Sequence, residues 1–181
     1  MSKRAIMSCL CAVACLMLIS AACTPPPNEA IAAAEDIIEQ AKDSQIDIYA
    51  TKEYDLAAAE LAKAKAHMAA EEYAEAKAAS EKTIALAKTA GEEAAVQKQL
   101  TKVDVDKKLP EFMERWAEIA GSMQKGRGRA AKALAGEAST FADSIQTQFN
   151  ELKNGEMWHE LNMALEAANS TADEFAEKAG S

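Results

Sequence analysis

The chain has 181 residues and a formal charge of −9 at pH 7, with 29 acidic residues against 20 lysines and arginines. A strongly acidic chain is poorly suited to general binding of nucleic acids or anionic lipids, because like charges repel each other across the interface. We therefore expect no nucleic-acid partner. Only seven glycines and four prolines are present and alanine is abundant, a composition that favours helices.

The first 22 residues have the layout of a secretory signal peptide. Lys3 and Arg4 supply a positive start, and an uncharged stretch of apolar or small residues follows over residues 5–22. This stretch is comparable in length to a short transmembrane helix, so an uncleaved membrane anchor is the alternative interpretation. Both interpretations place the remainder of the chain outside the cytoplasm.

The segment Ser20-Ala21-Ala22-Cys23 resembles the lipobox of bacterial lipoproteins, in which a diacylglyceryl group is attached to the cysteine sulfur before cleavage. Ser20 stands where that motif usually has an aliphatic residue. The resemblance implies cleavage before Cys23 and lipidation of Cys23, and two or more acyl chains hold a protein stably on a membrane. Thr24 resembles the sorting pattern for the outer membrane, so we expect the protein at the periplasmic face of that membrane.

Cleavage removes Lys3, Arg4 and three of the four cysteines. The mature chain then carries 18 basic and 29 acidic residues, a charge of −11. If Cys23 is lipidated as the resemblance implies, its sulfur is occupied, and we expect neither a disulfide nor thiol chemistry. Residues 23–28 form a tether, in which three successive prolines favour an extended polyproline II spacer.

An alanine-rich hairpin region follows over residues 29–108, where the spacing of apolar residues predicts three helices. We expect Asn28 to cap the first helix and Thr51 to cap the second, because their short polar side chains suit that position. Glu71 and Glu72 form the turn before the third helix.

The third helix is expected to run past Gly91. Val96, Leu100 and Val103 continue its apolar spacing into a polar segment. A break before Pro110 is then predicted, because proline disfavours a helical residue in front of it and favours the first turn of a new helix.

The C-terminal region, residues 109–181, is predicted to contain further helices with larger apolar side chains. Glycines interrupt the pattern at residues 125–129, an Asn-Gly pair ends the next helix at residues 154–155, and residues 169–171 are expected to bend or restart the last helix. These elements predict an all-α fold, an elongated bundle of about five to six helices. We expect the hairpin region and the C-terminal region to pack together as one bundle.

Residues 49–54 and 68–76 carry a resemblance to known families. The first segment opens a helix with Tyr-Ala-Thr-Lys-Glu-Tyr, and the second is an acidic turn that ends in tyrosine and continues as an alanine-rich helix. They resemble a short alanine-rich helical-hairpin domain of unknown function found in bacterial envelope lipoproteins, over residues 28–90. That resemblance implies no catalytic residues.

The same stretch resembles one tetratricopeptide unit. It departs from that repeat at Lys63, where leucine is usual, at Glu71, where glycine is usual, and at Ser80, where an aromatic residue is usual. No second copy follows at the repeat period, so the resemblance implies a tetratricopeptide-like hairpin without a superhelical groove.

Candidate metal ligands are few. Glu156 and His159 have the spacing of a di-iron bundle pair, but a second such pair is required, and His67 has Ala64 at that spacing. We expect no metal ion and no cofactor. The dispersed methionines are expected to fill the core rather than bind a soft metal. They are Met68, Met113, Met123, Met157 and Met163.

A basic cluster on this acidic chain is formed by Lys125, Arg127, Arg129 and Lys132. Two interpretations stay open. The cluster is either a solvated joint kept polar by its charge, or a contact for lipid headgroups or acidic groups of the cell wall.

The sequence contains no nucleophile elbow, glycine-rich phosphate loop or cysteine cluster, so we expect no enzymatic activity. The leading hypothesis is a lipid-anchored helical scaffold or interaction protein of the periplasmic envelope, with a protein or cell-wall partner. The alternative is a carrier that holds an apolar ligand or lipid near Trp116, Phe141, Phe149 and Trp158.

We predict that Cys23→Ala releases the cleaved protein from membranes, because no comparably long apolar segment follows residue 22. Fractionation with a salt wash measures the release, and mass determination of the N-terminus identifies the cleaved form. Salt-resistant membrane retention of the cleaved variant would count against the lipid anchor.

Overall fold

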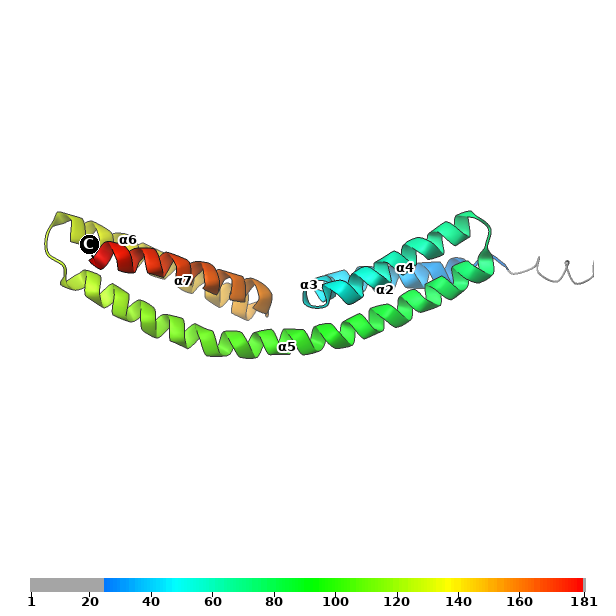
Figure 1. The fold of residues 1–181 in the computed structure, drawn as a ribbon, viewed down its shortest axis with the longest axis horizontal. Helices are drawn as coiled ribbons and strands as arrows, with labels where there is room; N and C mark the ends of the chain where they lie inside the picture. Colours follow the sequence, from blue (N-terminus) through cyan, green and yellow to red (C-terminus); the bar gives the residue numbers. More distant parts are fainter. Residues whose placement is uncertain (1–24, 181) are drawn as a thin grey trace, which may run out of the picture. The chain divides into compact units, whose positions relative to one another are not determined.

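The computed structural model describes residues 25–180, which form six helices and no strand (Figure 1). The predicted all-α fold is therefore confirmed. The helices are α2 (Asn28–Asp43), α3 (Ile46–Tyr49), α4 (Thr51–Ala69), α5 (Tyr73–Lys125), α6 (Arg129–Asn154) and α7 (Trp158–Gly180). The predicted signal peptide, the lipidation of Cys23 and the first residues of the tether lie outside the described residues.

The chain divides into two compact units, one ending at Gly91 and the other beginning at Glu92. The division falls inside α5, so this helix contributes its first part to one unit and the rest to the other. The sequence predicts a division between residues 108 and 109, next to the expected helix break. The packing of the two regions as one bundle stays a prediction.

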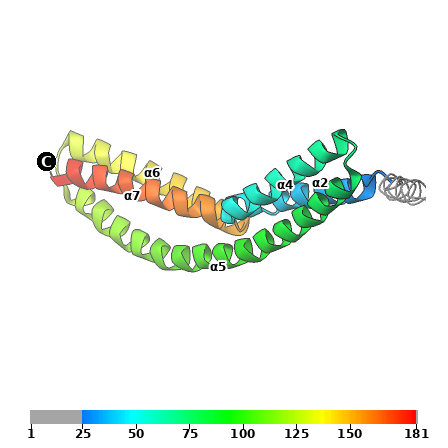
Figure 2. The same ribbon diagram turned by 45° about the vertical axis from the view of Figure 1, so that its right-hand side comes forward.

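In the first unit, α2, α3 and α4 pack against one another, and the first part of α5 runs beside them (Figures 1 and 2). Most buried side chains are alanines, whose small size permits close helix contacts. They are Ala34, Ala41, Ala50, Ala57, Ala64, Ala76, Ala79, Ala87 and Ala90. Two hydroxyls are buried as well. Ser80 and Thr83 donate to the carbonyls of Ala76 and Ala79, at 2.8 and 2.9 Å, so both keep a hydrogen-bond partner.

A carboxylate is also buried in this unit. Glu60 is 8% exposed, and its two oxygens accept hydrogen bonds or ion pairs from Lys63 at 2.8 Å and Lys82 at 3.1 Å. The hydrogen bond from Lys63 outweighs the opposing effect of burial and lowers the pKa of Glu60 below its ordinary value. The pair with Lys82 also connects α4 to α5.

Two helix ends place glutamate where glycine is usual. Glu71 and Glu156 have φ values of 61° and 53°, in the left-handed region. The N–H groups of Glu156 and Met157 donate to carbonyls in the last turn of α6. Helix α6 ends at Asn154 as predicted, but Gly155 keeps a φ of −80° and Glu156 adopts the left-handed conformation.

The predicted N-caps are wrong by one position. Asn28 and Thr51 are the first residues of α2 and α4, the preceding residues are Pro27 and Ala50, and neither helix has a side-chain cap bond. The Thr51 hydroxyl donates instead to the carbonyl of Asp47 at 2.7 Å. The hydroxyl of Thr51 therefore bonds to the preceding turn and does not cap α4.

Helix α5 runs through Pro110, so the predicted break there is wrong. Proline inside a helix removes a backbone hydrogen bond and costs roughly 3 kcal/mol. On either side of it, Val105, Phe112 and Trp116 are 0%, 2% and 5% exposed and share one helix face. Each fully buried large apolar side chain contributes about 1.5–3 kcal/mol, so keeping all three in register outweighs the cost of proline.

In the second unit, α6 and α7 lie side by side, with the second part of α5 along them (Figure 2). Their buried cluster contains Val105, Phe112, Trp116, Met123, Ala138, Ile145, Phe149, Trp158, Leu161, Leu165, Ala168, Ala172 and Phe175. The expected bend at residues 169–171 is absent, since α7 is continuous. Asn169 and Thr171 donate to carbonyls one turn back in the same helix, at 3.0 and 3.2 Å, which satisfies their side chains without a break.

Replacing Phe112 tests how much the second unit depends on its core. Phe112→Ala is expected to lower the free energy of unfolding by about 3–5 kcal/mol, because it leaves a cavity where a ring is 2% exposed. Val103→Ala is the control on the same helix, since Val103 is 56% exposed and its effect should stay within about 0.5 kcal/mol. Urea unfolding followed by circular dichroism measures both, and equal losses would contradict the assigned faces of α5.

The buried Glu60 makes the first unit sensitive to acid. Because folding lowers the pKa of Glu60, its ion pairs stabilise the fold above the ordinary value of 4.5 and lose that effect as the pH falls through the folded pKa. We expect Glu60→Gln to be less stable than the parent at pH 7 by at most about 1 kcal/mol, since both lysines are solvent-exposed. This difference in the free energy of unfolding should shrink in acid. The control is Glu75→Gln, at an exposed position. A difference independent of pH would refute this role.

Candidate interaction surfaces

Aromatic rings fill the region considered for an apolar ligand. Trp116 contacts Phe141 and Phe175 with ring centroids 5.0 and 5.5 Å apart, and Phe149 contacts Phe112 at 5.9 Å. The three contacts are edge-to-face, a favourable arrangement for aromatic pairs. These side chains therefore hold α5, α6 and α7 together.

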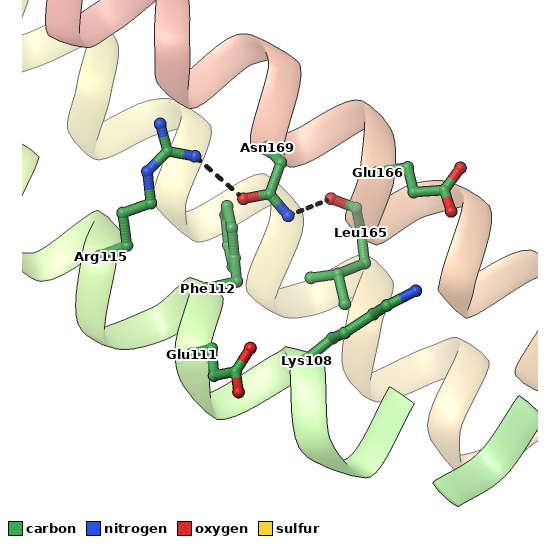
Figure 3. Close-up of a pocket in the computed structure, with 7 residues that line it drawn as sticks. All are labelled: Lys108, Glu111, Phe112, Arg115, Leu165, Glu166 and Asn169. Atoms are coloured by element: carbon green, nitrogen blue, oxygen red, sulfur yellow. Dashed lines mark hydrogen bonds between the residues drawn. The ribbon is translucent and has the colours of Figure 1, made fainter. Parts of the chain in front are cut away.

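A groove between α5 and α7 has a cavity volume of about 400 Å³ (Figure 3). It is lined by Lys108, Glu111, Phe112, Arg115, Leu165, Glu166 and Asn169. Arg115 donates to the side-chain oxygen of Asn169 at 3.1 Å, and Asn169 donates to the carbonyl of Leu165 at 3.0 Å. Arg115 also forms an ion pair with Asp173.

Lys108 is the second cation of the groove. Its ammonium lies 2.5 Å from a carboxylate oxygen of Asp104 and donates to Asn162 at 3.3 Å. The hydrogen bond to Asp104 raises the pKa of Lys108 above its ordinary value. Because Lys108 and Arg115 of α5 both contact residues of α7, the groove's polar edge fastens these two helices together.

Three large apolar residues of α5 face solvent. Val96, Leu100 and Val103 are 54%, 56% and 56% exposed. Their spacing places them on one helix face, and at roughly 100° per residue this face lies opposite the buried Ala94 and Val105. We call Val96, Leu100 and Val103 the α5 stripe. The sequence predicted their helical spacing but not that they point away from the core.

Charges of opposite sign flank the α5 stripe. Glu92 and Glu93 precede it, and Lys107 follows it, all three exposed. The ammonium of Lys107 takes part in no ion pair with the part of the chain described here. The stripe therefore has an acidic end at Glu92 and Glu93, and at its other end the cation of Lys107 lies next to the exposed Asp106.

The candidate metal pair lies at the start of α7. Glu156 precedes the helix with its carboxylate 3.9 Å from the Lys98 ammonium, and His159 is exposed in the first turn. Lys102 lies over the ring of Trp158, with its ammonium 5.2 Å from the ring centroid. These two contacts connect the α6–α7 turn to α5. Within residues 25–180, no group of three or more histidine, cysteine, aspartate or glutamate residues is placed to hold a metal ion.

The methionines divide between core and surface. Met123 is 4% exposed and fills the core as predicted, and Met68 and Met157 are half-buried. Met113 and Met163 are 39% and 58% exposed, so the prediction of core filling is wrong for these two.

Across the described helices, none has the length and apolar character needed to cross a membrane. No protein-family model matches the chain, and no curated protein or solved structure is significantly similar to it.

Proposed function

We propose that this protein is a lipid-anchored helical scaffold of the bacterial periplasm that binds a helix of a partner protein through the α5 stripe. The observation that carries the proposal is the exposure of Val96, Leu100 and Val103, each more than half accessible on a helix whose opposite face buries Ala94 and Val105. Contiguous exposed apolar residues are a feature of protein interaction sites.

The spacing of the stripe favours a helical partner. Residues at i, i+4 and i+7 line one side of a helix, and this is the pattern by which helices pack along one another. The flanking charges favour one polarity. A partner helix with basic residues near Glu92 and Glu93 complements the acidic end.

The expected lipid on Cys23 supports a scaffold role. A protein held on a membrane with its partner meets that partner at a raised effective concentration, so a small apolar stripe suffices for recognition. The proline-rich tether at residues 23–28 spaces the helices from the lipid.

The carrier alternative requires the aromatic rings of the second unit to separate. Trp116, Phe141 and Phe175 contact one another pairwise at centroid distances between 5.0 and 5.7 Å, and opening them loses those contacts. A scaffold uses a surface that is already exposed and needs no such rearrangement, so we favour the scaffold.

Photo-crosslinking in cells tests the proposed function. A photoreactive residue at Leu100 is expected to crosslink one defined protein, whereas the same residue at the exposed Gln146 of α6 should not. Val96→Glu should reduce the Leu100 crosslink at least about tenfold without unfolding the protein, because a buried unpaired charge costs several kcal/mol at an apolar contact. Equal crosslinking from both positions, or no effect of Val96→Glu, would contradict the proposal. A crosslink to a second copy makes the scaffold a homo-oligomer.

A further inference from the structure

The connection between α5 and α6 concentrates positive charge. Lys125, Arg127, Arg129 and Lys132 are all exposed, and no acidic residue lies between Glu118 and Glu137. None of the four cations forms an ion pair with the described residues, although the chain carries a net charge of −9. We call these four residues the basic tip.

Two glycines fix the backbone of the basic tip. A Cβ at Gly126 would lie 2.8 Å from the Cβ of Ala131, so only glycine permits this close approach of the connection to α6. Gly128 has a φ of 108°, which other residues rarely adopt. The basic tip is therefore a defined turn from which the cations project.

A pocket of mixed character opens beside the basic tip. It has a cavity volume of about 350 Å³ and is lined in part by Met123, Ala131 and Leu134, with Arg127 and Lys178 also contributing. The site thus places apolar side chains next to cations. That pairing matches a phospholipid surface, which presents phosphate next to glycerol and acyl chains, better than an anionic polysaccharide, which has no apolar chains.

We propose that the basic tip and its pocket form a docking site for an anionic phospholipid bilayer. Each lysine or arginine near an anionic membrane contributes about fivefold to affinity, so four together provide measurable attachment. The acidic remainder of the chain is repelled by the same surface. Charge complementarity therefore directs the basic tip to the lipid, in addition to any anchor at Cys23.

Vesicle capture tests this site with the full chain. Protein reconstituted in neutral phosphatidylcholine vesicles is offered fluorescent phosphatidylglycerol vesicles, and co-sedimentation is measured. We expect capture of these vesicles and not of phosphatidylcholine vesicles. Capture should fall in about 1 M salt, where the Debye length is about 3 Å.

Charge-matched variants locate the site. Replacing the four residues of the basic tip by glutamine is expected to reduce capture at least about tenfold. The control variant replaces four exposed lysines of other segments and lowers the charge equally. These are Lys42, Lys52, Lys88 and Lys153. The control should retain capture, and the single change Arg127→Gln should reduce it in the same direction as the full set.

Three results would overturn the docking site. One is equal capture by the basic-tip variant and its control. Another is absence of capture by the parent protein. The third concerns competitors of vesicle capture, compared at equal charge. If soluble polygalacturonate inhibits capture as strongly as unlabelled phosphatidylglycerol vesicles do, the basic tip binds polyanions in general. None of these measurements involves Val96, Leu100 or Val103, so they leave the scaffold proposal to its own test.

Discussion

The register of α5 against α6 and α7 is the constraint on which the second unit depends. Val105, Phe112, Trp116 and Met123 are at most 5% exposed and fall on one side of the helix, on both sides of Pro110. Burying this face keeps the helix continuous through proline. It also fixes the outward direction of the opposite face, so the exposure of the α5 stripe follows from core packing.

The two units are stabilised by different means. The second buries aromatic and leucine side chains, whose large apolar area supplies most of its stability. The first buries chiefly alanines, together with Ser80, Thr83 and Glu60, so it relies on close contacts and satisfied polar groups. A buried polar group that loses its hydrogen-bond partner destabilises the fold by more than the intact hydrogen bond stabilises it. The stability of the first unit therefore depends on Lys63 and Lys82, which pair with the buried Glu60.

Helical periodicity was sufficient to predict the all-α fold, but it did not predict the separate helix α3, and local rules failed where packing or backbone geometry decided the outcome. Proline favours a break by itself, yet the burial of Phe112 and Trp116 overrides it. The outward α5 stripe had a signal in the sequence. Extending the face of Phe112 backward in steps of seven passes through Val105 and Lys98 rather than Val96. The spacing of Val96 and Leu100 alone could not distinguish inside from outside.

The two candidate surfaces of the second unit depend on different forces. The α5 stripe acts through apolar contact, which is short-ranged and little affected by salt. The basic tip acts through charge, over about 8 Å at physiological ionic strength, and its attraction weakens as salt rises. An acidic protein is repelled by anionic surfaces except near a cationic site, so the proposed docking at Arg127 and its neighbours would set an orientation as well as an affinity. Because the proposed partner contact is apolar and the proposed membrane contact is electrostatic, a substitution can change either one without changing the other.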